Sequence, residues 1–468
     1  MNRHRGFGVI RLFNHYFHAW TLRRIFFDFL LSLAALAGVT MVQAESLRLA
    51  VPMVGAQVFS IAAGLFVINS ASGLYQRAQD WSLVESFWRA ALALALALAL
   101  TYQIFRVLPV GFGDIEAIRT SAMLVIAALI LRRVVMGYWA TKSRAGARVL
   151  IFGAGQAAHM VGSTLRAADP LATVVGYFPG PNEKHSVVTE AQHLSTHQSL
   201  LQTAQRLGVD EIIVALTERR SGSMPLRELL DCKLAGVRVF DITTYFERML
   251  GQIRIDFVNA GWLIFGDGFN QGFYRTTVKR VFDILCSLLL ILLAAPIMLL
   301  TAIAIKLESA GPVFYRQERV GYNSKGFMVT KFRSMRTDAE QDGKPRWATA
   351  NDKRVTRVGN FIRLVRIDEL PQLFNVLSGD MSLVGPRPER PFFVEQLTIE
   401  IPYYAVRHSI KPGVTGWAQV RYQYGSTIED SQEKLQYDLY YVKNHSLFLD
   451  FVILFETVGV VLTGKGAR

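Results

Sequence analysis

Charged residues are scarce in this sequence, and acidic ones are the scarcer kind. Of its 468 residues 19% are charged and 51% are hydrophobic, and 51 lysines and arginines outnumber 37 aspartates and glutamates, for a net charge of +14. An apolar chain with excess positive charge fits an anionic membrane surface and phosphorylated ligands. Nucleic acid is the competing partner for such a charge, but no recognisable nucleic-acid motif is present, so we expect no nucleic-acid partner.

Cysteine is almost missing. The two cysteines are Cys232 and Cys286, and the second lies within an apolar run. They offer neither a disulfide framework nor a metal-ligand cluster, which suits the reducing, cytoplasmic face of a membrane.

Four apolar runs occupy the first third of the chain, near residues 25–42, 49–68, 90–105 and 118–131. Each is close to the roughly 20 residues that a spanning helix needs. Basic residues precede the first run and follow the fourth, and positively charged flanks stay in the cytoplasm. We predict an N-terminal four-helix transmembrane bundle over residues 1–142, with both of its ends in the cytoplasm.

Residues 146–265 are predicted to form a Rossmann-like α/β domain. An apolar strand that begins at Arg148 ends in Gly153-x-Gly155, a spacing that lets backbone N–H groups approach a diphosphate. Further buried strands are predicted over residues 174–178, 211–216 and 237–240. An NAD site also needs an acidic residue at the end of the second strand, and Pro179-Gly180-Pro181 stand at that position instead. A scaffold role and a bound nucleotide therefore both stay open.

The most informative stretch contains Asp368 and Glu369, which stand side by side between arginines. Asp368 fits the N-cap of a short helix with Pro371 in its first turn and Gly379 near its end. A carboxylate at the positive end of a helix dipole stays ionised, and it suits nucleophilic attack on phosphorus or the binding of a divalent metal. The alternative is an ordinary capping Asp beside a solvated Glu, because caps are far commoner than sites.

Several ordered motifs surround this pair. KFRSM lies upstream, DELPQLFNVLSGDMSLVGPRP contains the pair, and KPGVTGWAQV lies downstream. Together they resemble the bacterial sugar transferase family, the polyprenyl-phosphate hexose-1-phosphate transferases that start exopolysaccharide and O-antigen synthesis. The resemblance is close from Lys279 onward and looser before it. It implies an α-rich, membrane-docked catalytic domain over residues 275–468, on the cytoplasmic face of a multi-pass protein of the bacterial inner membrane.

An apolar run near residues 280–306 is long enough to cross the membrane, and hydropathy alone favours a fifth span. A full span would carry the acidic pair to the far side, away from nucleotide sugars. Pro296 permits a sharp kink, and the family resemblance implies a re-entrant helix–break–helix within the cytoplasmic leaflet. We therefore predict re-entrance. A second apolar run at 446–463, interrupted by Asp450 and Glu456, is predicted to be an interfacial helix.

The resemblance also implies a two-step reaction. Asp368 attacks the β-phosphorus of a UDP-hexose and releases UMP, and polyprenyl (undecaprenyl) phosphate then takes the sugar phosphate from the aspartate. Glu369 assists, and Mg²⁺ bridges Asp368 and the diphosphate. Arg363 matches a family arginine of the polyprenyl phosphate site.

Further cations are predicted to hold the substrates. Pro386-Arg387-Pro388 presents one guanidinium on a stiff backbone, which suits planar recognition of phosphate or of the uridine part. The other candidate substrate-binding residues, expected at the level of the lipid headgroups, are Lys331, Arg333, Lys279 and Arg280. For any one of these cations an ordinary basic amphipathic surface is the alternative.

The identity of the sugar is not fixed by the sequence. Resemblance to large four-span members favours glucose and then galactose. The segment from Arg421 to Gly425 departs from the Asn-Gly that the family often has there, and this is a region associated with sugar selectivity. The polyprenol, the polysaccharide and the oligomeric state, including a homo-oligomer, are left open.

Two other classes of function compete with the transferase. A membrane-tethered, NAD-dependent nucleotide-sugar dehydratase or epimerase would use the glycine loop, but it would want a Tyr-x-x-x-Lys pair after that loop. Tyr138 and Lys142 have this spacing and precede the loop, which argues against such chemistry. A non-catalytic scaffold of a polysaccharide assembly complex would need no acidic pair among cations.

Overall fold

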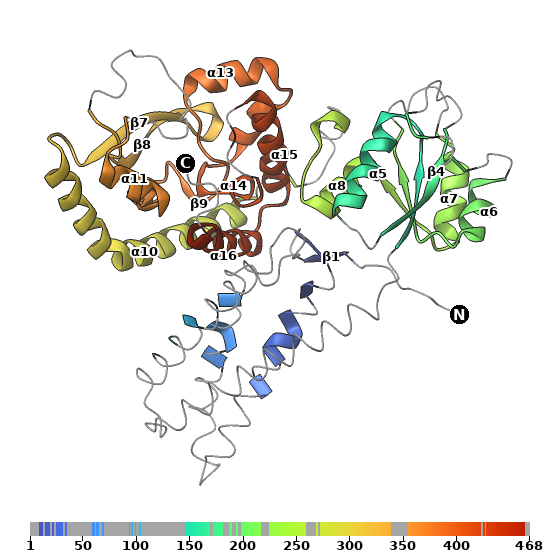
Figure 1. Cartoon of the computed structure of the whole chain (residues 1–468), viewed down its shortest axis with the longest axis horizontal. Helices are drawn as coiled ribbons and strands as arrows, with labels where there is room; N and C mark the ends of the chain where they lie inside the picture. Colours follow the sequence, from blue (N-terminus) through green and yellow to red (C-terminus); the bar gives the residue numbers. More distant parts are fainter. Residues whose placement is uncertain are drawn as a thin grey trace, which may run out of the picture. The chain divides into compact units, whose positions relative to one another are not determined.

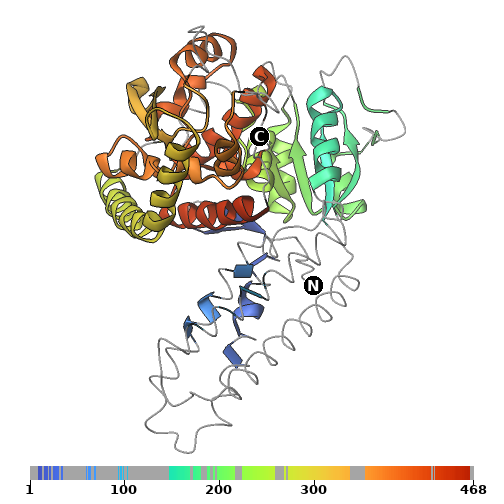
Figure 2. The same cartoon turned by 60° about the vertical axis from the view of Figure 1, so that its left-hand side comes forward.

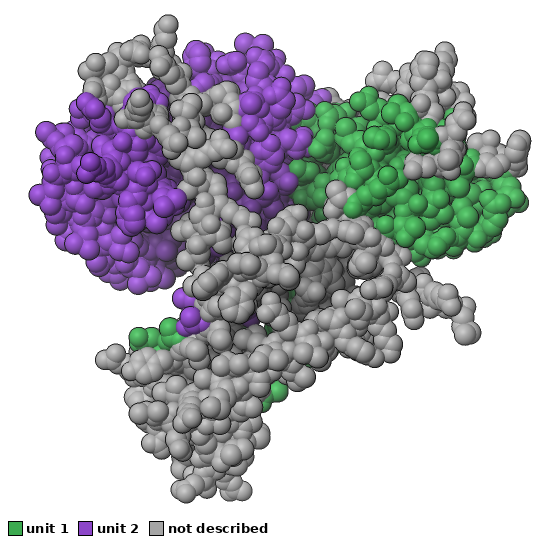
Figure 3. All heavy atoms as spheres, in the orientation of Figure 1, with its two compact units in different colours: residues 1–12, 16–63, 98–260 green, residues 13–15, 64–97, 261–468 purple. Residues whose placement is uncertain are grey.

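A computed structural model of the chain describes residues 147–168, 172–180, 187–189, 193–194, 198–216, 224–258, 268–269, 272–337, 354–422, 425 and 427–463, with short pieces between residues 9 and 103. The chain divides into two compact units, coloured separately in Figure 3. The first is made of residues 1–12, 16–63 and 98–260, and the second of residues 13–15, 64–97 and 261–468. The four predicted spans lie largely outside the described residues, and the predicted domain boundaries stay predictions.

A parallel four-stranded sheet is the centre of the first unit (Figure 1). Its strands are β3 (Arg148–Phe152), β4 (Thr173–Phe178), β5 (Glu211–Val214) and β6 (Arg238–Asp241), in the order β4-β3-β5-β6. All three pairings are parallel. The order reverses beside β3, as it does in doubly wound α/β folds. The three strands predicted after β3 are confirmed within two residues at each end.

Helices cover both faces of this sheet (Figure 1). The side chains of β3 alternate, so Val149 and Ile151 pack in one apolar core and Leu150 and Phe152 in another. The first core contains residues of α5 (Gln156–Ala168) and α8 (Ile242–Leu250), and the second contains residues of α6 (Leu200–Arg206) and α7 (Leu226–Leu234). A continuous apolar strand is what a sheet buried on both faces requires.

The glycine loop after β3 makes hydrogen bonds within its own unit. Gly153 has a φ of 129°, which L side chains rarely adopt, and its N–H donates to the carbonyl of Phe178 at 2.8 Å. The Val187 N–H donates to the carbonyl of Ala154 at 3.0 Å. Because the Gly153 N–H is used inside the fold, the loop favours the scaffold alternative.

A long apolar helix, α10 (Phe273–Glu308), is prominent in the second unit. It has 36 residues and a mean hydropathy of 2.9 in its most apolar stretch, and it is the one helix among the described residues that is long and apolar enough to cross a membrane. Pro296 lies inside the helix, and Figure 1 shows the ribbon of α10 changing direction along its length. The predicted interruption of the helix at Pro296 is therefore not present. The helix continues through the proline, because loss of one hydrogen bond can bend a helix without ending it.

Both ends of α10 contact the rest of the second unit. Near the start, Arg280 donates to the carbonyls of Val376 at 2.5 Å and Leu377 at 2.8 Å. At the end, the Glu308 carboxylate accepts from the Arg357 N–H at 2.7 Å. Between these ends, large apolar side chains such as Leu292, which is 72% exposed, face outward. An apolar middle with both ends tied to one unit is the arrangement that re-entrance requires, and re-entrance itself stays a prediction.

The other elements of the second unit are short. They are the antiparallel pair β7 (Phe314–Val320) and β8 (Gly326–Phe332), the parallel pair β9 (Ser382–Val384) and β10 (Gly413–Thr415), the helices α11 (Arg357–Leu364), α12 (Gln372–Ser378), α13 (Pro391–Glu400), α14 (Trp417–Arg421), α15 (Ile428–Asn444) and α16 (Leu447–Thr463), and the 3₁₀ turns η4 (Tyr322–Ser324), η5 (Ile367–Glu369) and η6 (Tyr404–Ser409). The remaining elements are η3 (Ile255–Phe257) and β1 (Val9–Leu12), which belong to the first unit, and β2 (His15–His18), which is divided between the two units.

The predicted helix over residues 446–463 is confirmed as α16, which lies beside the first part of α10 (Figure 1, Figure 2). Asp450, which was expected only to interrupt an apolar surface, is fully buried. Its carboxylate accepts from Lys279 Nζ at 2.7 Å and from the Tyr441 hydroxyl at 2.5 Å. The acid is therefore an internal link between α10, α15 and α16.

Candidate active site

A cavity of about 1180 Å³ lies within the second unit. Its lining includes the carboxylates Asp368 and Glu369 and, around them, cations from β7, β8, α11 and the loop after β9. Apolar side chains of α10 and α16, such as Leu289 and Leu454, line it as well. The cavity thus combines charges suited to phosphate groups with a lining suited to an apolar chain.

The acidic pair stands on a short 3₁₀ turn rather than at a helix N-terminus. Arg366 has a positive φ of 59°, and this left-handed residue turns the chain from α11 into η5. The following helix begins at Gln372 with Pro371 as its N-cap, so the predicted capping role of Asp368 is wrong. The end predicted at Gly379 is confirmed, because Gly379 is the left-handed C-cap with a φ of 96°.

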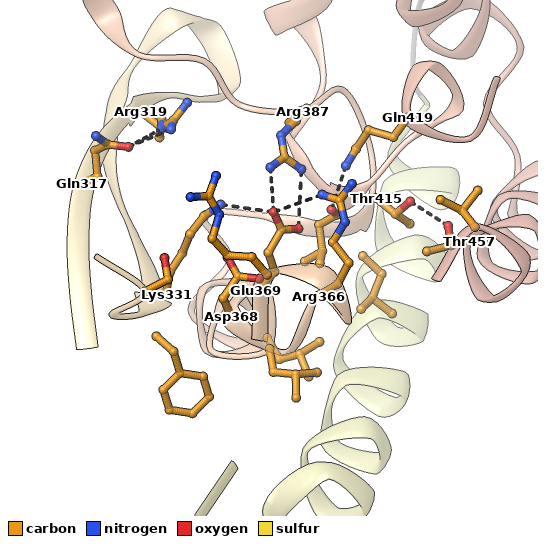
Figure 4. Close-up of a pocket in the computed structure, with 18 of the residues that line it drawn as sticks. Gln317, Arg319, Lys331, Arg366, Asp368, Glu369, Arg387, Thr415, Gln419 and Thr457 are labelled. Carbon is orange, nitrogen blue, oxygen red and sulfur yellow. Dashed lines mark hydrogen bonds and ion pairs between the residues drawn. The ribbon is translucent and has the colours of Figure 1, made fainter. Parts of the chain in front are cut away.

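Glu369 is held by cations. Arg387 Nη2 lies 2.6 Å from Glu369 Oε1, Lys331 Nζ lies 3.2 Å from the same oxygen, and Arg366 Nη1 lies 3.8 Å from it (Figure 4). Burial would raise the pKa of Glu369, but Arg387 and Lys331 outweigh it and hold that pKa well below its usual range. Glu369 is therefore an ionised anchor that positions cations, and it has little freedom to exchange a proton.

Asp368 differs from its neighbour. It is 9% exposed, and its Oδ1 is buried with no hydrogen-bond partner among the described residues. Burial, together with the charge of Glu369, raises the pKa of Asp368 to about 6 against the pull of Lys331, Arg387 and Arg363. Asp368 is therefore still mostly ionised at neutral pH, as predicted, but the helix dipole that was expected to hold it so is not there, because Asp368 lies on η5. One poorly solvated carboxylate oxygen is left in the cavity with cations around it.

The predicted magnesium ion can be compared with this donor set. Among the described residues, no group of three or more His, Cys, Asp or Glu side chains is placed to hold a metal. Both oxygens of Glu369 lie near Arg387, at 2.6 and 3.5 Å, which leaves Asp368 Oδ1 as the carboxylate atom without a partner. Mg²⁺ often takes one or two carboxylates and completes its shell with substrate phosphates and water. The site thus fits Mg²⁺ that arrives with a diphosphate.

Asn375 on α12 holds the strand that carries Lys331. Its side-chain oxygen accepts from the Thr330 N–H at 3.0 Å, and its amide donates to the carbonyl of Met328 at 2.8 Å. The side chain thereby replaces a partner strand at the edge of β8. This contact fixes Lys331 relative to the acidic pair, which leads directly into α12.

The other predicted residues divide into two groups. Arg363 and Arg333 line the cavity with Lys331 and Arg387, although Arg333 Nη2 is bonded to the Ser309 carbonyl at 2.8 Å. Pro386 and Pro388 flank Arg387 and are not among the residues that line the cavity.

Lys279 and Arg280 belong to the second group. Neither lies among the residues that line the cavity, because Lys279 pairs with Asp450 and Arg280 with the carbonyls at the end of α12. The structure therefore does not bring these two cations to the acidic pair.

Three functional candidates escaped the sequence analysis. Arg366 carried a signal, since it precedes Glu369 at a spacing of three residues. Arg407 and Asp438 carried none. They lie in separate elements and form a buried ion pair of 2.8 Å that lines the cavity, and no local pattern connects them.

Known proteins are similar to the part of the chain that contains this cavity. The family profile described as bacterial sugar transferase matches residues 274–464. A UDP-N-acetylgalactosamine-undecaprenyl-phosphate N-acetylgalactosaminephosphotransferase of Aeromonas hydrophila is 48% identical over 242 residues, which cover 52% of this chain and 56% of the relative. A UDP-glucose:undecaprenyl-phosphate glucose-1-phosphate transferase of Klebsiella pneumoniae is 39% identical over 274 residues, covering 57% and 58%.

The match thus spans little more than half the length of these two relatives. A smaller relative is covered almost entirely: the exopolysaccharide production protein PSS of Rhizobium leguminosarum bv. phaseoli is 44% identical over 198 residues, which cover 40% of this chain and 98% of the relative. Residues 274–464, which the family profile matches, include all the residues that line the cavity, the acidic pair among them. On this similarity, the chain belongs to the bacterial sugar transferase family.

Proposed function

We propose that this chain transfers hexose-1-phosphate from a UDP-sugar to polyprenyl (undecaprenyl) phosphate and releases UMP, as the first step of an exopolysaccharide or O-antigen synthesis. One observation carries the proposal. Asp368 has a buried oxygen with no partner among the described residues. The cations beside it, Arg387 and Lys331, are held in place by ion pairs with the neighbouring Glu369. The names of the relatives agree with this class of reaction.

The proposed chemistry proceeds in two displacements at one phosphorus. A carboxylate oxygen of Asp368 forms a bond to the β-phosphorus while the bond from that phosphorus to the bridging oxygen breaks, and UMP leaves with the electron pair. A phosphate oxygen of the polyprenyl phosphate then bonds to the same phosphorus, and the Asp368 carboxylate leaves. Both steps conserve charge without requiring a base, which fits the strongly ionised and fully engaged Glu369.

The cations around Asp368 have a clear task in this scheme. Two anionic phosphates and a carboxylate must approach each other, and preorganised positive charge lowers the repulsion between them. Arg387, Lys331 and Arg363 each favour the ionised form of Asp368 and line the cavity. Asp368 would also hold Mg²⁺ together with the diphosphate, and the bound ion would supply further neutralisation of the phosphoryl oxygens.

The acceptor requires access from the membrane. The apolar side chains of α10 and α16 that line the cavity suit the isoprenoid chain of a polyprenyl phosphate, with Arg363 near its phosphate. We propose a multi-pass protein of the bacterial inner membrane whose α10 enters and leaves by the cytoplasmic leaflet. In a variant without Cys232 and Cys286, single cysteines at Phe273 and Leu307, which are 87% and 83% exposed, test this. Re-entrance predicts that an impermeant maleimide labels both from the cytoplasmic side, and a span predicts one from each side.

The donor is to be found by experiment. The names of the two relatives given above divide between N-acetylgalactosamine and glucose, and the sequence favours glucose and then galactose. Membranes carrying the protein are incubated with radiolabelled UDP-glucose, UDP-galactose or UDP-N-acetylgalactosamine, undecaprenyl phosphate and Mg²⁺. The proposal expects label in the organic phase and UMP in the aqueous phase for at least one donor. Absence of both for every donor, with folded protein present, would overturn it.

A further inference from the structure

The loop that carries Arg387 is held almost entirely through its carbonyl groups. Pro386 and Pro388 have no N–H, so the loop has few donors of its own, and its carbonyls need donors from elsewhere. The four carbonyls from Pro386 to Glu389 accept in turn from the Gly413 N–H at 3.0 Å, Arg407 Nη2 at 2.8 Å, Arg319 Nη1 at 3.1 Å and the Val320 N–H at 2.9 Å. Each carbonyl thus uses a different donor group.

Arg407 is the buried member of this set. Its guanidinium is 6% exposed and makes three bonds, to the carbonyl of Arg387, to the Tyr404 hydroxyl at 2.7 Å and to Asp438 Oδ2 at 2.8 Å. Asp438 is 1% exposed and lies on α15, while Arg407 lies on η6. Both Nη atoms are engaged in this way, while Nε has no hydrogen-bond partner among the described residues. A buried charge is costly unless it is paired, so the pairing with Asp438 restricts the orientation of the guanidinium.

A short chain of contacts leads from Arg407 to the acidic pair. Arg407 holds the backbone of Arg387, the Arg387 side chain holds Glu369 at 2.6 Å, and Glu369 adjoins Asp368. A shift of the Arg387 backbone would therefore move the guanidinium that faces both carboxylates. Misplacement by about 1 Å at such a position can cost on the order of 100-fold in rate.

We infer that Arg407, oriented by Asp438, is a positioning residue for phosphoryl transfer. It fixes Arg387 by holding the carbonyl of that residue. The inference rests on the proposed function and adds to it a buried pair that acts on the reaction through the backbone of Arg387. It makes the stiffness of the Pro386–Pro388 turn depend on a side chain contributed by η6. It also explains why an ion pair so fully removed from water is kept beside the cavity, where an apolar pair could fill the same space.

The test is a double-mutant cycle in the full-length protein, using the donor that wild type turns over fastest. Arg407→Gln and Arg387→Gln are each expected to lower kcat/KM, by roughly 30-fold and 100-fold. If Arg407 acts through Arg387, the double variant loses roughly 100-fold and not roughly 3000-fold, because the second change has nothing left to disturb. Arg407→Lys keeps the charge without the three-way fork and is expected to lose at least roughly 10-fold.

Arg275→Gln provides the matched control. Arg275 also donates to a backbone carbonyl, that of His445, but it is not among the residues that line the cavity. Its loss is expected to add to that of Arg387→Gln without coupling. Rates are compared per folded protein, measured by protease resistance.

A second measurement does not depend on turnover. Hydrogen exchange of the Gly413 and Val320 amides, which donate to the loop carbonyls of Pro386 and Glu389, is expected to rise at least about threefold in Arg407→Gln and to stay unchanged in Arg275→Gln. Fully additive losses in the cycle, or unchanged exchange of these two amides, would overturn the positioning role while leaving the transferase intact. Wild type that turns over no donor would instead overturn the proposed function, and with it this inference.

Discussion

The two units of the molecule treat buried charge in opposite ways. In the described part of the first unit, between residues 147 and 258, the strands are surrounded by apolar side chains. Among the described residues of that range, Glu247 alone is a buried charged residue. In the described part of the second unit, from residue 268 onward, such residues are numerous: Asp283, Arg333, Asp368, Glu369, Arg407, Asp438 and Asp450. Burying a charge is costly unless it is paired, so each of these residues calls for a partner.

Pairing separates the structural charges from the chemical one. Asp450 is fully buried and receives two short bonds, from Lys279 and Tyr441, and it links three helices. Asp368 keeps an oxygen with no partner among the described residues, although cations lie nearby. Strongly perturbed groups with unused bonding capacity in a cavity are the usual mark of a functional site. The contrast therefore favours the second unit as the place of the chemistry.

The largest effect is expected from Asp368→Asn. An amide cannot form the proposed bond to phosphorus, so kcat/KM should fall by roughly 10⁴-fold or more while the fold is kept, because the substitution preserves shape. UMP release per folded protein is the measurement. A loss of less than about tenfold would contradict the assignment of Asp368 as nucleophile.

A smaller effect is expected from pH. Asp368 must be ionised to attack, and its pKa is raised to about 6, so it becomes protonated as the pH falls through that value. Below about pH 6, kcat/KM should fall about tenfold per unit, where an ordinary aspartate would stay active to about pH 4.

Glu369→Gln sharpens this prediction. The negative charge of Glu369 contributes to the raised pKa of Asp368, so its removal should move the acid limb to lower pH, even though activity is reduced overall. Thermal melts over the same pH range control for unfolding. A limb that stays near pH 6 in this variant would show that another group titrates.

Lys279→Met is expected to change stability and leave transfer alone. It removes the cation 2.7 Å from the buried Asp450 carboxylate, which should cost about 3–5 kcal/mol. KM for both substrates should stay unchanged per folded protein, because Lys279 is not among the residues that line the cavity. A stable variant with a raised KM would restore the substrate-binding role that the sequence predicted.

The smallest effect on transfer is expected from the first unit. A side chain at Gly162, on α5, would collide with the hydroxyl of Tyr177 on β4. Gly162→Ala should therefore destabilise the sheet by about 1–3 kcal/mol through overpacking. UMP release per folded protein should equal that of wild type. A specific loss of transfer would mean that the sheet does more than support.

Sequence reasoning succeeded where the signal is local. Strands β4, β5 and β6 are continuous apolar runs, and Gly379 marks a helix end through its own conformational freedom. It failed at Asp368, because the chain turns at Arg366, and arginine gives no local sign of a left-handed conformation.

Long-range pairing accounts for the other failures. Lys279 was predicted as a substrate-binding residue, and the structure pairs it instead with Asp450, which lies 171 residues away in the sequence. Arg407 and Asp438 were missed for the same reason, since their ion pair exists only once η6 and α15 are packed together. Asp368, Glu369 and Arg387 could be named from the sequence because they lie in one continuous motif.

Trapping the covalent intermediate tests the central claim most directly. Wild type and Asp368→Asn are each incubated with a UDP-sugar carrying radioactive phosphorus in its β-phosphate, without acceptor lipid, and the protein is then precipitated. The account predicts label on wild type, its transfer to the organic phase when undecaprenyl phosphate is added, and none on Asp368→Asn. Transfer by wild type with no labelled protein, or equal label on both proteins, would contradict Asp368 as the nucleophile.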